Sequence, residues 1–157
     1  MTGPEICFED FFEGQEIDLG KVTVDRDEVI DFARRYDPQY FHVDEDAAKD
    51  SIFGGLIASG WHTGAMMMRL LCDRIFLRSS SMGSPGIDQL RWVRPVRPGD
   101  TLNLRARVLS AKESRSKPDR GSVDMSYKVF NQNSELAMTF QAVTMFGRRN
   151  PGERTDG

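Results

Sequence analysis

The sequence has 157 residues, enough to bury one sizeable core but too few for two ordinary domains, so we expect a single domain. Acidic residues outnumber basic ones by 24 to 21, and the resulting formal net charge of -3 excludes a global attraction to nucleic acid or to an anionic membrane. The N-terminal residues lack the basic start and apolar run of a signal peptide, and no segment approaches the roughly 20 apolar residues of a membrane span, which predicts a soluble cytoplasmic protein.

The first predicted helix covers residues 25–36. Asp25 is a suitable N-cap, and Glu28 three positions later can complete a capping box. The apolar residues that follow repeat at helical spacing, at Val29, Phe32, Ala33 and Tyr36. The helix must end at Asp37, because Pro38 disfavours the α conformation for the residue before it. A second, short helix should begin near Asp44, whose carboxylate can cap it.

A loop with several glycines, residues 53–61, leads into the longest periodic apolar segment of the chain. Apolar residues recur there at intervals of three or four, at Trp61, Ala65, Met68, Cys72, Ile75 and Phe76. Most of the other positions are apolar too, so we expect this helix to be buried.

After this helix the period of the apolar pattern changes to two, which is typical of strands. Four strands are predicted, over residues 87–93, 102–108, 123–129 and 136–146. The last ten residues are polar, which predicts a folded domain over residues 1–147 and a disordered tail over residues 148–157.

One long buried helix followed by at least four antiparallel strands indicates an α+β fold, in which a curved sheet wraps the helix. This is the hotdog layout. Such a sheet leaves an edge strand that must be paired or covered, so we expect a homodimer, or a higher homo-oligomer, that joins two sheets edge to edge.

Two segments, Tyr36-Asp-Pro-Gln-Tyr-Phe-His42 and Phe53-Gly-Gly-Leu-Ile-Ala-Ser-Gly-Trp-His-Thr63, resemble the MaoC-like dehydratase and R-specific enoyl-CoA hydratase family. The family signature is an Asp, any residue, Asn, Pro, any residue and His, so the resemblance implies that Asp37 and the loop residue His42 are the catalytic pair. Gln39 and Tyr40 differ from the signature Asn and Pro. Gly60 matches the glycine whose backbone amide holds the thioester oxygen in the family.

The resemblance implies reversible hydration of a trans-2-enoyl-CoA to an (R)-3-hydroxyacyl-CoA. A carboxylate must take a proton from water while a donor supplies one to the α carbon, and Asp37 and His42 can share these roles through one bound water. Negative charge that develops on the thioester oxygen is stabilised by a fixed amide at a helix N-terminus, here that of Gly60. Glycine also permits close ligand approach and unusual backbone angles.

The substrate needs further contacts, for which Ser59 and Gly55 beside the helix start are candidates. Coenzyme A carries phosphates, and the charged segment 112–120 offers Arg115 and Lys117 between two strands. Arg91, Arg94 and Arg97 form an alternative phosphate site, and a charged segment of this kind is also typical of a plain solvated hairpin loop.

Other readings of the same residues remain open. An Asp before Pro is commonly only a helix stop, and His62 has the pattern of a helix-surface or pocket-wall residue. A hotdog thioesterase and a non-catalytic acyl-CoA binding subunit are the alternative functions. Two cysteines and two histidines favour free thiols and no metal site, and no cofactor is expected because coenzyme A is part of the substrate.

Overall fold

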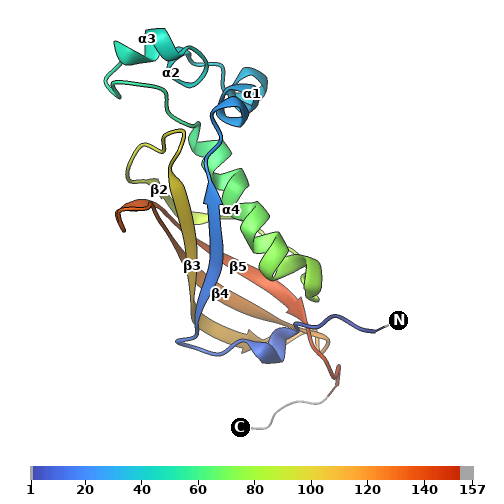
Figure 1. Cartoon of the computed structure of the whole chain (residues 1–157). Coiled ribbons are helices and arrows are strands. Elements are labelled where there is room, and N and C mark those ends of the chain that lie inside the picture. The colour runs from blue at the N-terminus through green and yellow to red at the C-terminus, as the bar shows by residue number, and fades with distance from the viewer. Residues whose placement is uncertain (1, 153–157) are drawn as a thin grey trace.

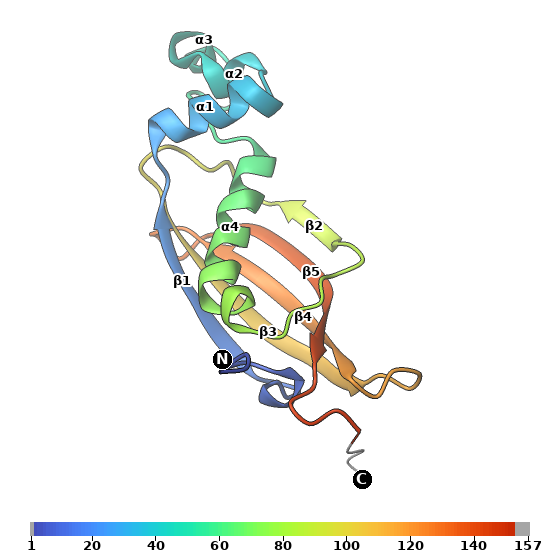
Figure 2. The same ribbon diagram turned by 90° about the vertical axis from the view of Figure 1, so that its right-hand side faces the viewer.

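The period-two segments form the long strands of one antiparallel sheet in the computed structural model, which describes residues 2–152. The strand order is β1-β3-β4-β5-β2. The bounds are Glu16–Thr23 for β1, Asp88–Trp92 for β2, Thr101–Glu113 for β3, Arg120–Phe130 for β4 and Leu136–Gly147 for β5. The sheet curves around the helix α4, Gly60–Arg74 (Figure 1, Figure 2). The predicted α+β hotdog fold is therefore confirmed.

The core lies between the sheet and α4, because alternate residues of the central strands face the helix. On β3 and β4, Leu104 is paired with Val129 and Ala106 with Tyr127, and all four are buried. Met67 on α4 is also buried and belongs to the same apolar cluster. The alternation seen in the sequence thus correctly identified which face of each central strand is apolar.

β1 is a strand that the sequence reading did not predict. It pairs with β3, and Leu19 near its middle is fully buried. The pairing shifts between Asp18 and Lys21, where Gly20 has a φ of +96°, a conformation that glycine adopts without strain. This bulge interrupts the alternation of apolar and polar residues, which explains why the pattern did not indicate a strand.

The prediction that α4 is buried holds for one face of the helix only. Trp61 and Met68 are 61% and 45% exposed, and Ala65 is exposed as well. The buried residues of α4 are His62, Thr63, Met66, Met67 and Leu71. Two apolar faces lie next to each other on this helix, so the periodicity could not decide which of them packs on the sheet.

Three short helices lie beyond one end of the sheet, next to the start of α4 (Figure 1). They are α1 (Arg26–Tyr36), α2 (Tyr40–Val43) and α3 (Glu45–Lys49). Asp25 caps α1 by accepting from the Glu28 amide, and Asp44 caps α3, as predicted. The Glu28 carboxylate differs from the predicted capping box, because it bonds His62 instead. His42 lies in the helical turn α2 and not on a loop.

The folded part of the chain extends past residue 147. Arg148 is buried, its backbone amide donates to the Asp119 carbonyl, and the Arg149 amide donates to the Glu9 carboxylate. The start of the disordered tail was therefore predicted too close to the N-terminus, because these two arginines form ion pairs with acidic residues of the domain. Residues 153–157 lie outside the described part of the chain. Within residues 2–152, no helix is both long and apolar enough to cross a membrane.

Candidate active site

Asp37 and His42 come together at the junction of α1 and α2. Asp37 is the C-cap of α1, as Pro38 requires, and α2 begins three residues later at Tyr40. This reversal brings Nε2 of His42 to 3.2 Å from Oδ2 of Asp37. The two side chains are only 6% and 19% exposed, so their interaction is partly shielded from water.

The orientation of the His42 ring is set by the backbone. Nδ1 lies 2.8 Å from the carbonyl oxygen of Ile57. A carbonyl can only accept a hydrogen bond, so Nδ1 carries the hydrogen and Nε2 is left for Asp37 and for a ligand. The edge of the Phe41 ring packs against the imidazole with centroids 4.5 Å apart.

Two side chains hold the Asp37 carboxylate. Ser59 Oγ donates to Oδ2 at 2.7 Å, and Gln39 Nε2 donates to Oδ1 at 2.7 Å. Burial by itself raises the pKa of Asp37, but these donors and the nearby His42 outweigh it, so the pKa lies below its ordinary value of 3.8. Asp37 is therefore an anion at neutral pH. Gln39, which departs from the family signature, keeps an amide in the supporting role.

A cavity of about 400 Å³ opens in front of this pair. Asp37, His42 and Gly60 all line it, together with aromatic side chains and a short segment next to β2. The aromatic lining residues are Phe41, Phe53, Trp61 and Trp92. A mostly apolar cavity with a few converging polar groups is the usual form of a small-molecule site.

Gly60 is the first residue of α4, and its amide belongs to the first turn, where backbone donors have no partner within the helix. The Trp92 indole Nε1 donates to the Gly60 carbonyl at 3.1 Å, and a Cβ at Gly60 would overlap the indole ring. Glycine is therefore required by this packing, and not by an unusual backbone angle as expected. Nothing in the sequence pattern indicated the role of Trp92, which lies on an edge strand far along the chain.

The remaining predicted site residues are arranged differently. Ser59 is completely buried and bonds Asp37, so it positions the carboxylate and does not face the cavity. Gly55 packs beside the guanidinium of Arg97, which donates to the Phe53 carbonyl and so braces this loop. Neither Ser59 nor Gly55 lines the cavity.

Of the basic residues considered for the phosphates, Arg94 of the alternative set is the one among the described residues that lines the cavity. Arg94 lines the cavity and forms an ion pair with Glu135 at 3.0 Å. Arg115 and Lys117 lie on the hairpin between β3 and β4, at the opposite end of the sheet from α2 (Figure 1, Figure 2). The structure does not bring them to the same cavity within one copy of the chain.

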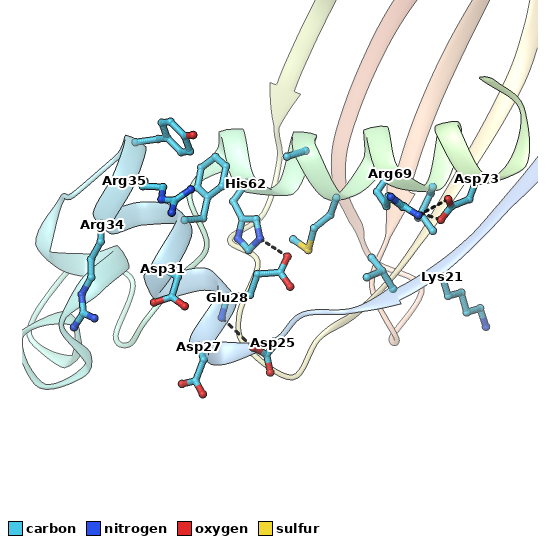
Figure 3. Close-up of a pocket in the computed structure, with 16 residues that line it drawn as sticks. Lys21, Asp25, Asp27, Glu28, Asp31, Arg34, Arg35, His62, Arg69 and Asp73 are labelled. Carbon is cyan, nitrogen blue, oxygen red and sulfur yellow. Dashed lines mark hydrogen bonds and ion pairs between the residues drawn. The ribbon is translucent and has the colours of Figure 1, made fainter. Parts of the chain in front are cut away.

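A larger and more open hollow of about 1030 Å³ lies between α1, α4 and β1 (Figure 3). Most of the residues that line it are charged, and His62, which is only 2% exposed, forms part of its wall. His62 is thus a buried wall residue and not a helix-surface residue. We regard the smaller cavity as the candidate active site, because the three residues predicted for catalysis, Asp37, His42 and Gly60, line it together. Residues 2–152 contain no cluster of three or more His, Cys, Asp or Glu side chains suited to a metal ion.

Comparison with known proteins gives concordant results. The family model described as MaoC like domain matches residues 11–131. Nodulation protein N of Rhizobium meliloti is 30% identical over 147 residues, covering 90% of this chain and 89% of that protein. The crystal structure of a MaoC-like dehydratase from Rhodospirillum rubrum is 38% identical with a TM-score of 0.84, covering 92% of this chain and 99% of the other. An R-hydratase from Pseudomonas aeruginosa has a TM-score of 0.74 over 92% of this chain and 87% of its own, and its 24% identity shows likeness of fold alone.

Proposed function

The chain belongs to the MaoC-like dehydratase family, and from this premise we propose that it reversibly hydrates a trans-2-enoyl-CoA to an (R)-3-hydroxyacyl-CoA. The observation that carries the proposal is the convergence of Asp37, His42 and the first amide of α4 on one apolar cavity. A water held between the carboxylate and Nε2 of His42 has a base within reach and a ring nitrogen beside it that can receive the proton and pass it on.

Each group has a defined task in the proposed reaction. Asp37 takes a proton as the water oxygen bonds to C3, and the electron pair of the C2–C3 double bond moves toward the thioester oxygen. The amide of Gly60 donates to that oxygen while it carries negative charge. Asp37 passes this proton to Nε2 of His42, which lies 3.2 Å away, and Nε2 delivers it to C2, so both groups return to their starting state. The His42 ring is kept in place by the Ile57 carbonyl. Dehydration runs through the same steps in reverse.

The hydrogen bonds to Asp37 favour this reaction over a merely binding role. A carboxylate that receives donors from Ser59 and Gln39 is held as an anion in one orientation, which is the state a general base requires. A thioesterase would need the same carboxylate to direct water at the thioester carbonyl. The Gly60 amide would then hold the oxygen of a tetrahedral intermediate.

We further propose that two copies of the chain assemble through β2. This strand lies at one edge of the sheet. Large apolar side chains on or next to it are exposed, namely Ile87, Trp92, Val93 and Trp61, whose ring packs on Trp92. Such a patch next to an open edge favours a partner of the same kind. Because Trp92 and Val93 also line the cavity, the partner would border the site.

The purified protein tested with crotonyl-CoA decides between these functions. Hydration is followed by loss of the enoyl thioester absorbance and by chromatography of the product, and thiol release is measured in the same samples. We expect a hydroxyacyl-CoA and no free coenzyme A. Thiol release without hydration would favour the thioesterase, and binding without turnover across a panel of enoyl thioesters would overturn the enzymatic proposal.

A further inference from the structure

A second imidazole–carboxylate pair joins α1 to α4 outside the candidate active site. Nε2 of His62 lies 3.0 Å from Oε1 of Glu28, and the two side chains point toward one another in Figure 3. The pair lines the larger hollow, whereas Asp37 and His42 line the smaller cavity. The proposed chemistry therefore does not use it directly.

The surroundings of His62 make this contact specific. Its side chain is 3% exposed and stacks on the Phe32 ring of α1, with centroids 4.8 Å apart and planes at 15°. Nδ1 is buried and has no hydrogen-bond partner within the described residues. A buried donor without an acceptor is costly, so the hydrogen of the neutral ring resides on Nε2, where it is donated to Glu28. His62 thus has one directional bond, and that bond reaches α1.

The two residues of this pair lie on the two helices that carry the candidate site residues Asp37 and Gly60. The helix α1 carries Glu28 and Phe32 and ends at Asp37. The helix α4 begins with Gly60, two residues before His62. The helix α1 lies beyond the end of the sheet (Figure 1), where Val29 and Ile30 pack into the apolar core. Apolar packing sets no direction, whereas the bond between Glu28 and His62 fixes one point of α1 on α4.

We propose that His62 is a positioning residue that fixes α1 on the first turn of α4 and thereby keeps Asp37 in register with His42 and the Gly60 amide. This inference rests on the proposed hydratase function for its kinetic consequences. A small displacement of α1 would separate Asp37 from the other two groups, and misplacement by about 1 Å can cost roughly 100-fold in rate.

The variants His62→Phe, Glu28→Ala and Glu28→Gln separate the bond from simple packing. Phenylalanine keeps an aromatic ring to stack on Phe32 but has no donor, so a pure packing role predicts full activity for His62→Phe. We expect kcat to fall about 10- to 100-fold with KM little changed, for His62→Phe and Glu28→Ala alike. Glu28→Gln keeps an oxygen that accepts from Nε2 and should restore most of the rate. Asp31→Asn, on the same helix and in the same hollow, is the matched control and should behave like the wild type.

A readout that does not need activity comes from the two histidines of the chain. The NMR signals of the His42 ring are assigned with His62→Phe, which has one imidazole left. We expect these signals to shift in Glu28→Ala and to stay in place in Asp31→Asn, because only the former alters the contact between Asp37 and His42. If His62→Phe and Glu28→Ala lose only melting temperature, with kcat and the His42 signals unchanged, the inference is overturned. Should the wild type prove inactive, the His42 signals alone decide it.

Discussion

Nε2 of His42 and Oδ2 of Asp37 lie 3.2 Å apart, although Asp37 ends one helix and His42 belongs to the next. Other atoms of both side chains are already engaged, Nδ1 by the Ile57 carbonyl and Oδ1 by Gln39. Oδ2 also accepts from Ser59 Oγ, and it faces Nε2 at the wall of the cavity. The fold therefore leaves one carboxylate oxygen and one ring nitrogen without its own hydrogen at the cavity, where they can take up a proton and pass it on.

Asp37→Asn removes the proposed general base with little change in shape. We expect kcat/KM for enoyl-CoA hydration to fall by roughly 10²- to 10⁴-fold, because the amide cannot take a proton from water. Asp44→Asn is the matched control, since Asp44 caps α3 away from the cavity and asparagine caps helices equally well. Steady-state kinetics of both variants check this, and an Asp37→Asn enzyme with wild-type turnover would remove Asp37 from the reaction.

The pKa of Asp37 sets the acid limb of the pH–rate profile. Burial raises this pKa, but the bonds from Gln39 and Ser59 and the nearby His42 bring it below 3.8, so the active anion persists at least down to that pH. A lowered pKa in the folded state also stabilises the fold above the unfolded-state pKa, and this stabilisation is lost as pH falls through the folded-state pKa.

Ser59→Ala removes one donor to the carboxylate and should raise the pKa of Asp37. We therefore expect the acid limb of kcat/KM, and the acid-induced loss of stability, to move to higher pH in this variant. Rate measurements and acid unfolding followed by circular dichroism test both. An unchanged acid limb would mean that another group controls it.

The position of Asp37 and His42 could be predicted from the sequence, whereas much of the structure around them could not. The end of α1 at Asp37 was predictable, because Pro38 acts directly on the backbone of the residue before it. The strand β1 was not, because the bulge at Gly20 hides its alternation. The contact of Trp92 with Gly60 joins segments 32 residues apart, and no local pattern carries such information.

Gly60→Ala should damage the site by steric overlap with Trp92. A methyl group at this position overlaps the indole, so the start of α4 or Trp92 must move, and both line the cavity. We expect a lower melting temperature and a loss of hydration of at least about 10-fold, in line with the loss of one oxyanion donor. The double variant Gly60→Ala with Trp92→Leu gives the methyl group room and should recover melting temperature. Equal melting temperatures for the single and double variants would contradict the steric account.

Variants of Arg94 and of the hairpin residues Arg115 and Lys117 test which basic residues bind the phosphates of coenzyme A. Arg94 lines the cavity, so Arg94→Ala should raise KM for crotonyl-CoA about 10-fold if its guanidinium meets a phosphate. KM for crotonyl-pantetheine, which lacks the phosphates, should not change. Arg115→Ala and Lys117→Ala should leave both KM values unchanged if one copy of the chain holds the whole substrate. An effect of the hairpin variants alone would assign the phosphates to Arg115 and Lys117.

Ile87→Lys tests the proposed assembly through β2. Ile87 directly precedes this edge strand and is 53% exposed, so a charge there would be buried without a partner in the dimer. We expect light scattering to show monomers for Ile87→Lys at concentrations where the wild type is dimeric. Hydration should fall as well, because the cavity opens next to the same edge. Leu109→Lys on β3, 38% exposed and three strands away from β2, is the control and should stay dimeric. A dimeric Ile87→Lys would place the interface elsewhere, and an active monomer would show that one chain completes the site by itself.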